Sequence, residues 1–238
     1  MLRDLEIDSI VTFGTYEQNG NFDGKKEPIE WIVIDKNDDG AFLLSKKVLD
    51  CAEFDSTGDV ENRDPSAEDY IQTHWDNSSI RMMLNEGFYN NAFSDEEKKQ
   101  IKDTNTIPYI KVPDYSDEDY YSESLDDDYE DIIDDLNKLR KLQGEPTTDK
   151  VVILSAKELE YYKILTSDIK PEPTDYAIKM GINCSTDIDG KIISKYWTRT
   201  LESYFEVYIA DVYEVIDEST HILDESIGIR PAIWVNFE

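Results

Sequence analysis

The chain of 238 residues is 39% hydrophobic and carries 15 Tyr, 8 Phe and 4 Trp, which excludes a wholly disordered protein. Its length suits one sizeable core, so we expect a single domain over residues 1–238. The 54 acidic residues outnumber the 24 basic ones and give a formal charge of −30, which disfavours direct binding to nucleic acid or membrane and favours a basic protein surface as the partner.

The cysteines and the N-terminus indicate where the protein resides. Cys51 and Cys184 occur in no paired spacing of the C-x-x-C kind, so we expect buried, reduced thiols. Residues 1–14 include several acids and no apolar run of signal-peptide length, and no stretch approaches the ~18 apolar residues of a membrane span. The sequence therefore predicts a soluble, cytoplasmic protein.

The first fifty residues are rich in β-branched and aromatic side chains. Residues 9–16 (SIVTFGTY) and 29–50 (IEWIVIDKNDDGAFLLSKKVLD) have the composition of strands, and KNDDG at 36–40 supplies turn residues within the second run. This pattern predicts an N-terminal β-meander. Residues 52–72 show no sustained periodicity, so we expect a loop there with at most a short helix.

The hydrophobic period becomes helical in residues 73–93. Four apolar residues fall on one face: Ile80, Met83, Leu84 and Phe88. Asp76 is the predicted N-cap, because Trp75 and Ile80 then stand at the spacing of a hydrophobic staple.

Two later helices are predicted from capping boxes, in which a Ser and a Glu three residues apart each bind the other's backbone N–H. Ser94 and Glu97 form the first box, directly after the helix of residues 73–93. Ser155 and Glu158 form the second box, at the end of a buried-strand pattern, VVILS. The middle of the chain therefore contains helices.

The last fifty residues return to strand patterns. Residues 191–200 (KIISKYWTRT), 204–217 (YFEVYIADVYEVID) and 228–237 (GIRPAIWVNF) alternate apolar and polar side chains. An order of strands, helices and strands predicts an α+β fold with a mixed or antiparallel sheet, in which strands from both ends of the chain take part and two or three helices lie in the middle.

Residues 112–148 form a predicted acidic insertion, since Tyr115–Asp135 holds eleven carboxylates and no Lys or Arg. Residues 126–143 have an amphipathic helical pattern with acids at its start and bases at its end, which suits the helix dipole. Residues 114–124 are predicted to be a mobile loop rich in Asp and Tyr. The insertion is either a partner-binding surface or a solvated surface that only maintains solubility, and the second role is the commoner one for such charge runs.

Under the first interpretation, the insertion's carboxylates bind the partner, and some of them can imitate a phosphate backbone. The predicted partner-binding residues are Asp114, Asp117, Glu118, Asp119, Glu123, Asp126, Asp127, Asp128, Glu130, Asp131, Asp134 and Asp135.

No catalytic residue, metal site or cofactor is predicted. His74 and His221 have no second ligand at a metal-binding spacing, and no phosphate-binding or nucleophile-elbow motif is present. STDIDG at 185–190 resembles part of a calcium loop but lacks the closing Glu, so we expect a turn. EPTD at 172–175 is interpreted as the start of a helix capped by its Thr and ended by Gly181.

Several separated motifs resemble those of a bacterial and phage domain-of-unknown-function family, numbered 6273. They are VTFGTY, PIEWIVID, FLLSKKVLD, THWDNSSIRMMLNEGFYNNAFSDEEKKQI, VVILSAKE, KPEPTDYAIKMG, KYWTRT and GIRPAIWV. The resemblance covers nearly the whole chain and implies no known activity. The family usually has two Trp where this chain has Tyr196 and Trp197. Its W-x-R and G-x-R-P elements are similar to those of C-type-lectin-like folds, including formylglycine-generating enzymes and phage receptor-binding domains.

Five residues inside these motifs are candidates for a site: Trp75, Arg81, Trp197, Arg199 and Arg230. They form either an Arg/Trp pocket for a carboxylate or phosphate ligand, or an internal framework of cation–π contacts and hydrogen bonds that joins helices to sheet. The framework is favoured.

Three functions follow in order of preference. The first is a non-catalytic recognition module with an acidic surface. The second is a phage-type acidic inhibitor that mimics nucleic acid and blocks a nucleic-acid-binding protein. The third, an enzyme with a formylglycine-type fold, ranks lowest because no nucleophile or metal ligands support it.

Overall fold

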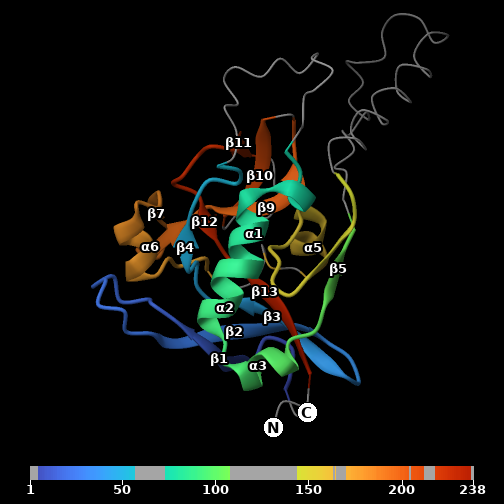
Figure 1. The fold of residues 1–238 in the computed structure, drawn as a ribbon. Helices are drawn as coiled ribbons and strands as arrows, with labels where there is room; N and C mark the ends of the chain where they lie inside the picture. Colours follow the sequence, from blue (N-terminus) through green and yellow to red (C-terminus); the bar gives the residue numbers. More distant parts are fainter. Residues whose placement is uncertain are drawn as a thin grey trace, which may run out of the picture.

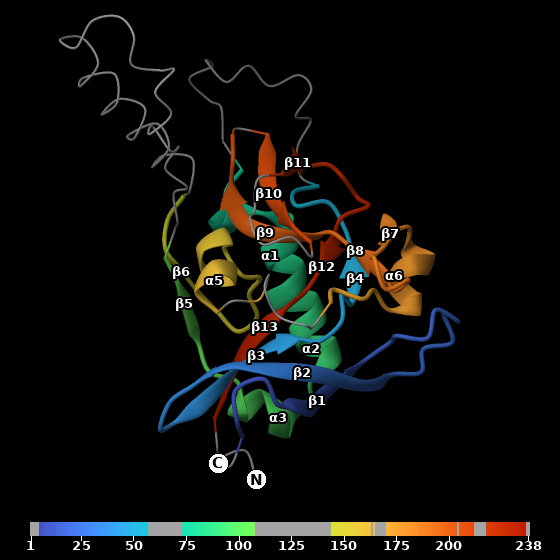
Figure 2. The same cartoon turned by 180° about the vertical axis from the view of Figure 1, so that it is seen from behind.

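The computed structural model describes residues 5–56, 73–107, 144–162, 164, 170–203, 205–211 and 218–236. Two sheets form the centre of the fold (Figures 1 and 2). The four-stranded sheet is antiparallel in the order β1 (Ile10–Tyr16), β2 (Glu27–Lys36), β3 (Gly40–Ser45) and β13 (Ala232–Asn236). The predicted β-meander and the pairing of strands from both ends of the chain are therefore confirmed.

The second sheet has five strands and is mixed. Its order is β11 (Ser219–His221), β10 (Glu206–Ala210), β9 (Tyr196–Leu201), β12 (Gly228–Ile229) and β4 (Asp50–Cys51), with β12 parallel to β9. Two small antiparallel pairs complete the strands, β5 (Thr104–Thr106) with β6 (Thr147–Asp149), and β7 (Cys184–Thr186) with β8 (Ile192–Ser194). The α+β class is confirmed.

The chain crosses between the two sheets at two adjacent places. One crossing joins β3 to β4, and the other joins β12 to β13. Backbone hydrogen bonds link the crossings, since Ser45 N donates to Pro231 O at 2.8 Å and Leu49 N donates to Ile229 O at 3.0 Å. The predicted strand 228–237 is thus two short strands, one in each sheet.

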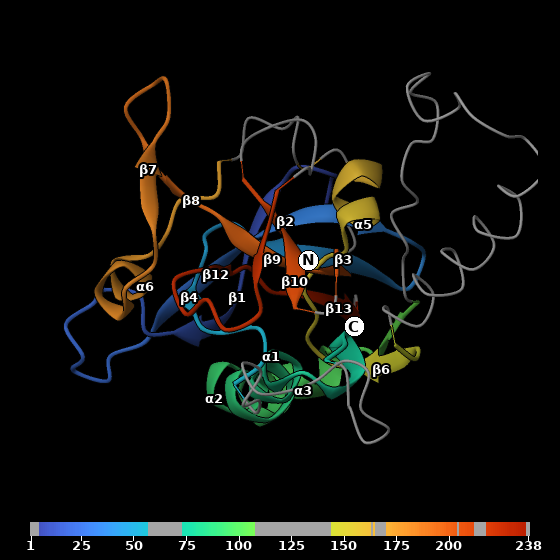
Figure 3. The ribbon, with the colours of Figure 1, turned by 90° about the horizontal axis from the view of Figure 1, so that it is seen from above.

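One helical rod lies against the sheets and consists of α1 (Ser79–Met82), a π-helical segment (Met83–Phe88) and α2 (Tyr89–Ala92). Ile80, Leu84 and Phe88 are buried, as the period predicted. Viewed from above, this rod lies on one side of the strands and α5 (Ala156–Tyr161) lies on the other (Figure 3).

The predicted start of this rod was wrong. Trp75–Asn77 form a 3-10 turn, closed by the Asn77 side chain, which accepts from His74 N at 2.6 Å. Ser78 is extended after that turn, and its hydroxyl caps α1 by accepting from Arg81 N at 3.4 Å. Asp76 therefore lies inside the 3-10 turn and is not the N-cap of the helix.

The other caps are as predicted. Capping boxes start α3 (Asp95–Gln100) at Ser94 and α5 at Ser155. Thr174 caps α6 (Asp175–Met180), which ends at Gly181 with φ 109°. No helix within the described residues is both long and apolar enough to cross a membrane.

The two cysteines differ in exposure. Cys51 is buried in β4, as expected, whereas Cys184 is exposed in β7. The expectation of a buried Cys184 was wrong because β7 and β8 form a hairpin that leaves every β7 side chain exposed.

Candidate functional site

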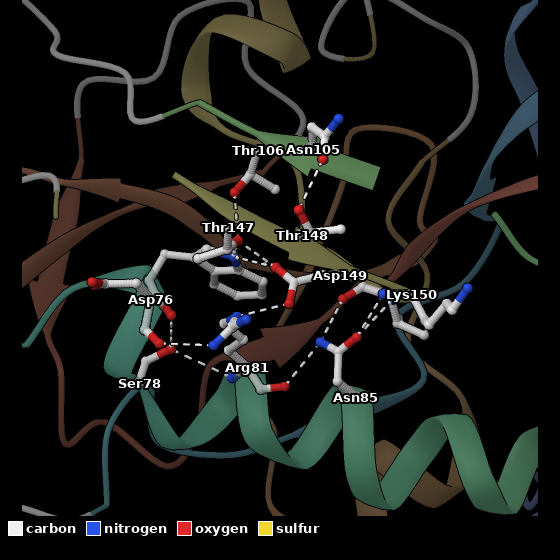
Figure 4. Close-up of polar contacts among 12 residues, drawn as sticks. Asp76, Ser78, Arg81, Asn85, Asn105, Thr106, Thr147, Thr148, Asp149 and Lys150 are labelled. Atoms are coloured by element: carbon white, nitrogen blue, oxygen red, sulfur yellow. Dashed lines mark hydrogen bonds and ion pairs between the residues drawn. The ribbon is translucent and has the colours of Figure 1, made fainter. Parts of the chain in front are cut away.

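A buried carboxylate joins two of the five candidate residues (Figure 4). Asp149 Oδ1 accepts from Arg81 Nε at 2.8 Å, and Asp149 Oδ2 accepts from Trp75 Nε1 at 3.1 Å and from Thr147 Oγ1 at 2.5 Å. The Asp149 side chain is 2% exposed. A carboxylate so placed needs charged and polar donors, and these three side chains supply them.

The same cluster extends into the helical rod and the small sheet. Arg81 also donates to Asp76 O at 2.8 Å. Asn85 Oδ1 accepts from Lys150 N at 2.8 Å and Val151 N at 3.0 Å, while Asn85 Nδ2 donates to Arg81 O at 3.1 Å. The Asn85 side chain therefore joins the helical rod to the residues that follow β6.

This cluster, which we call the Asp149 clamp, holds the two strands that flank the predicted acidic insertion. Thr106 faces Thr147 in the β5–β6 register, and their hydroxyls lie 2.6 Å apart. Thr147 and Thr148, the last residues of the predicted insertion, lie in β6. Thr106 and Thr147, the paired residues on the two sides of the acidic segment, are therefore held side by side in one anchored strand pair.

Gly144 fits tightly against the turn that precedes α1. Its φ is +72°, and a Cβ there would lie 2.5 Å from both Asp76 Oδ1 and His74 Cβ. The next residue, Glu145, donates its backbone N–H to Asp76 Oδ2 at 3.4 Å. The returning chain is thus seated on the 3-10 turn.

Gly144→Ala is expected to lower the free energy of unfolding by about 2 kcal/mol, since alanine must adopt a left-handed backbone and displace the Asp76 carboxylate. Urea denaturation measures the loss. Gly24→Ala is the matched control, because Gly24 also has a positive φ, +71°, and a Cβ there meets no atom within 4 Å. A loss at Gly144 no larger than at Gly24 would contradict this seating.

Arg199 belongs to a second cluster. Its guanidinium donates to both carboxylate oxygens of Glu158, at 2.7 Å for Nη2–Oε1, and to Ile153 O at 2.8 Å. Burial opposes ionisation of Glu158, but the Arg199 charge and hydrogen bonds from Arg199 and Ser155 outweigh it and lower the pKa of Glu158. This carboxylate therefore caps α5 and binds Arg199 on β9 at once.

Arg230 lies at the two sheet crossings. It is 1% exposed, donates to Ser45 O at 2.9 Å and Lys46 O at 3.4 Å, and stacks its guanidinium 5.3 Å from the centre of the Tyr196 ring. Trp197 is fully buried and donates to Ala52 O at 2.7 Å. Arg230 thus ties β9 to the β3–β4 crossing.

The model of one protein family, a domain of unknown function named DUF6273, matches residues 38–237. The chain belongs to this family. The match begins inside the β2–β3 turn, so the VTFGTY and PIEWIVID motifs that we had assigned to the family lie outside it. No curated protein and no solved structure matches the chain.

The five candidate residues of this DUF6273 protein occupy four places. Trp75 and Arg81 meet at Asp149, Arg199 meets Glu158, Arg230 meets Tyr196 at the sheet crossings, and Trp197 donates to Ala52 O. Every one of these guanidinium groups donates to protein oxygens. The three arginines bind different acceptors, and none of them is among the residues that line the two cavities described below.

Sequence reasoning missed two of the carboxylates that organise these clusters. Glu158 was identified only as a capping-box residue. Its second role, as the partner of Arg199, could have been found by a search for acidic partners of buried arginines. Asp149 had a weaker signal, an isolated acid just before the apolar VVILS run. Each pair joins residues far apart in the chain, 68 positions for Asp149 with Arg81 and 41 for Glu158 with Arg199.

Two surface cavities lie away from these clusters. One, of about 320 Å³, lies between the β1–β2 loop and α6 and includes Gln18, Glu27 and Asp175. The other, of about 310 Å³, includes Cys184 and Ile227. Within the described residues no three His, Cys, Asp or Glu side chains are placed to hold a metal ion.

The predicted partner-binding carboxylates, from Asp114 to Asp135, lie outside the described residues. The amphipathic helix predicted for residues 126–143, and most of the loop predicted for residues 52–72, also lie outside them.

Proposed function

We propose that this DUF6273 protein is a non-catalytic recognition module that presents its acidic insertion to a basic protein surface. The observation that carries the proposal is the Asp149 clamp. It uses a buried carboxylate, an arginine and an indole to fix the β5–β6 pair from which the insertion leaves and to which it returns.

The position of the clamp supports display of the insertion. A strand pair bound only by its own hydrogen bonds is marginal, whereas β6 is held to the helical rod through Asp149 and through Asn85. Twelve acidic and three basic residues lie between Asp114 and Lys141, so the segment carries a concentrated negative charge. The β5–β6 pair holds it to the rest of the protein. Such charge accelerates and orients encounters with cations.

The motif arginines support a binding role over chemistry. Arg81, Arg199 and Arg230 each donate to protein oxygens, so their charge is used to hold elements together. The C-type-lectin-like likeness is part of the same proposal, since such folds recognise ligands through segments mounted on a rigid sheet. The proposal also includes a cytoplasmic location for the protein.

The test is a pull-down from the native host with the full chain and with a variant in which the twelve acids of the insertion are changed to Asn or Gln. We expect the native chain to retain a basic protein that elutes with moderate salt, and the variant to retain none of it, because the contact is electrostatic. Equal recovery on both chains would refute the proposal.

Two controls make the pull-down interpretable. Residues 108–143 can be replaced by about four Gly/Ser residues, because Thr106 and Thr147 already face each other across the strand pair. This shortened chain should unfold at nearly the same temperature as the native chain and bind nothing. If the recovered partner binds nucleic acid and added duplex DNA displaces it, the protein is an inhibitor that mimics nucleic acid.

A further inference from the structure

The β7–β8 hairpin has an unpaired outer edge. Asp187 N donates to Lys191 O, so Asp187 and Lys191 form a hydrogen-bonded pair, and the next such pair along the ladder is Ser185 with Ile193. Cys184 and Thr186 alternate with them, so their N–H and C=O groups point away from β8. Within the described residues, β7 has β8 as its one neighbouring strand.

This edge lacks the features that usually block strand addition. Charged side chains, proline and bulges protect the edges of natural sheets, and β7 has the sequence Cys-Ser-Thr with none of them. The hairpin is also held in shape, because Asp187 Oδ1 accepts from Asp189 N at 2.9 Å and Lys191 N at 2.8 Å. Asn183 fastens its base by donating to Ser226 Oγ at 2.7 Å.

The cavity of about 310 Å³ lies at the base of the hairpin. Asn183 and two residues of β7, Cys184 and Ser185, line it, and so does Lys195, which follows β8 (Ile192–Ser194). The cavity therefore adjoins the Cys184 end of the β7 edge. Buried Ile209 and Ile227 supply an apolar floor.

The charges around the cavity select the occupant. Glu218 and Asp224 line it, and its single base, Lys195, is already paired with Glu218. The formal charge of −30 on the whole chain adds a long-range preference for cations.

We propose that the outer edge of β7 and this cavity form a second binding site, which takes an extended basic peptide as an added strand. The peptide backbone bonds to Cys184 and Thr186, its alternate apolar side chains rest on Ile209 and Ile227, and its lysines or arginines face Glu218 and Asp224. This site is independent of the acidic insertion, because it uses none of the insertion's residues.

Fluorescence anisotropy with a labelled Lys-Val-Lys-Val-Lys-Val peptide tests the site. We expect the full chain to bind this peptide and Thr186→Pro to weaken binding at least tenfold, because proline removes the outward N–H of the edge. Thr186→Ser is the matched control and should bind as the native chain does. A Glu-Val peptide of the same length should not bind.

A Lys-Gly peptide separates the effect of charge on binding from the effect of strand addition. It has the same charge as the Lys-Val peptide but a low strand propensity. Its binding to the acidic insertion should be equal in the native chain and in Thr186→Pro. The inference is overturned if the Lys-Val peptide binds no better than the Lys-Gly peptide, or if Thr186→Pro binds both as the native chain does.

A second measurement needs no variant. Cys184 is exposed and Cys51 is buried, so iodoacetamide should modify Cys184 first. Saturating Lys-Val peptide should slow that alkylation several-fold by covering the edge, whereas the Lys-Gly peptide should not. An unchanged alkylation rate with bound peptide would place the peptide elsewhere and overturn the inference.

Discussion

Replacement of Arg199 by alanine is expected to lower the free energy of unfolding by about 3 kcal/mol and Tm by roughly 6–12 °C. Arg199 is 7% exposed and donates to Glu158 and to Ile153 O. Its loss leaves the Glu158 charge without its partner and the Ile153 carbonyl without a donor. Urea denaturation followed by tryptophan fluorescence reports this directly, since Trp197 lies two residues away on β9.

The pH dependence of a partner variant, Glu158→Gln, separates the ion pair from simple loss of packing. The pKa of Glu158 is lowered in the folded protein from its usual value of 4.5, so its stabilisation is present above about pH 4.5 and is lost as the pH falls through the folded pKa. The difference in unfolding free energy between the native chain and Glu158→Gln should therefore be largest at neutral pH and shrink in acid.

Two comparisons can contradict this account of Arg199. Lys99→Ala breaks an exposed pair with Glu96, 69% and 81% exposed, and should change stability by less than about 0.5 kcal/mol. If Arg199→Ala is equally mild and instead abolishes binding of a small carboxylate or phosphate ligand, Arg199 lines a ligand pocket.

Local signals in the sequence predicted the local structure well. Both Ser-Glu capping boxes, the Thr174 cap and the Gly181 end are confirmed, because each depends on residues within about one helical turn of one another. The turn at residues 36–40 is likewise confirmed, and Asn37 Oδ1 there accepts from Asp39 N at 2.9 Å and Gly40 N at 3.0 Å.

The prediction failed where two local signals competed. Asp76 and Ser78 are both good N-caps, and the staple spacing favoured Asp76. The chain forms a 3-10 turn here because the Asn77 side chain closes it. The turn also places Trp75 within hydrogen-bonding distance of Asp149, which lies in the neighbouring small sheet. Periodicity over residues 73–93 contains no information about that distant carboxylate.

The exposure of the Cys184 side chain also could not be predicted from the sequence. Cysteine is among the most buried residue types, and Cys184 occurs in no paired spacing of the C-x-x-C kind, so a buried thiol was expected. Among the described strands, β7 pairs with β8 alone, and this hairpin exposes Cys184. Such a pairing is a long-range outcome that no local window of sequence reveals.

Asp149→Ala is expected to cost about 4 kcal/mol of unfolding free energy. The change removes a carboxylate that is 2% exposed, so among the acceptors in the described residues the Trp75 indole N–H keeps only Thr147 Oγ1 and the Arg81 guanidinium keeps only Asp76 O. Asp149→Asn should cost about 2 kcal/mol, because its amide oxygen still accepts one bond while its N–H₂ faces a donor. Urea denaturation of both variants measures these losses.

A double-mutant cycle with Arg81→Ala tests whether the clamp acts as a unit. We expect a coupling energy of about 2 kcal/mol between Asp149 and Arg81, since Arg81 Nε loses its charged partner once the carboxylate is gone. Hydrogen exchange should also accelerate in β5, residues 104–106, in the Asp149→Ala chain, because β6 loses one of its attachments to the helical rod and, among the described strands, β5 pairs with β6 alone. A loss of unfolding free energy below about 1 kcal/mol, with unchanged exchange in β5, would show that something other than Asp149 holds the β5–β6 pair. The proposed recognition function would then lose the observation that carries it.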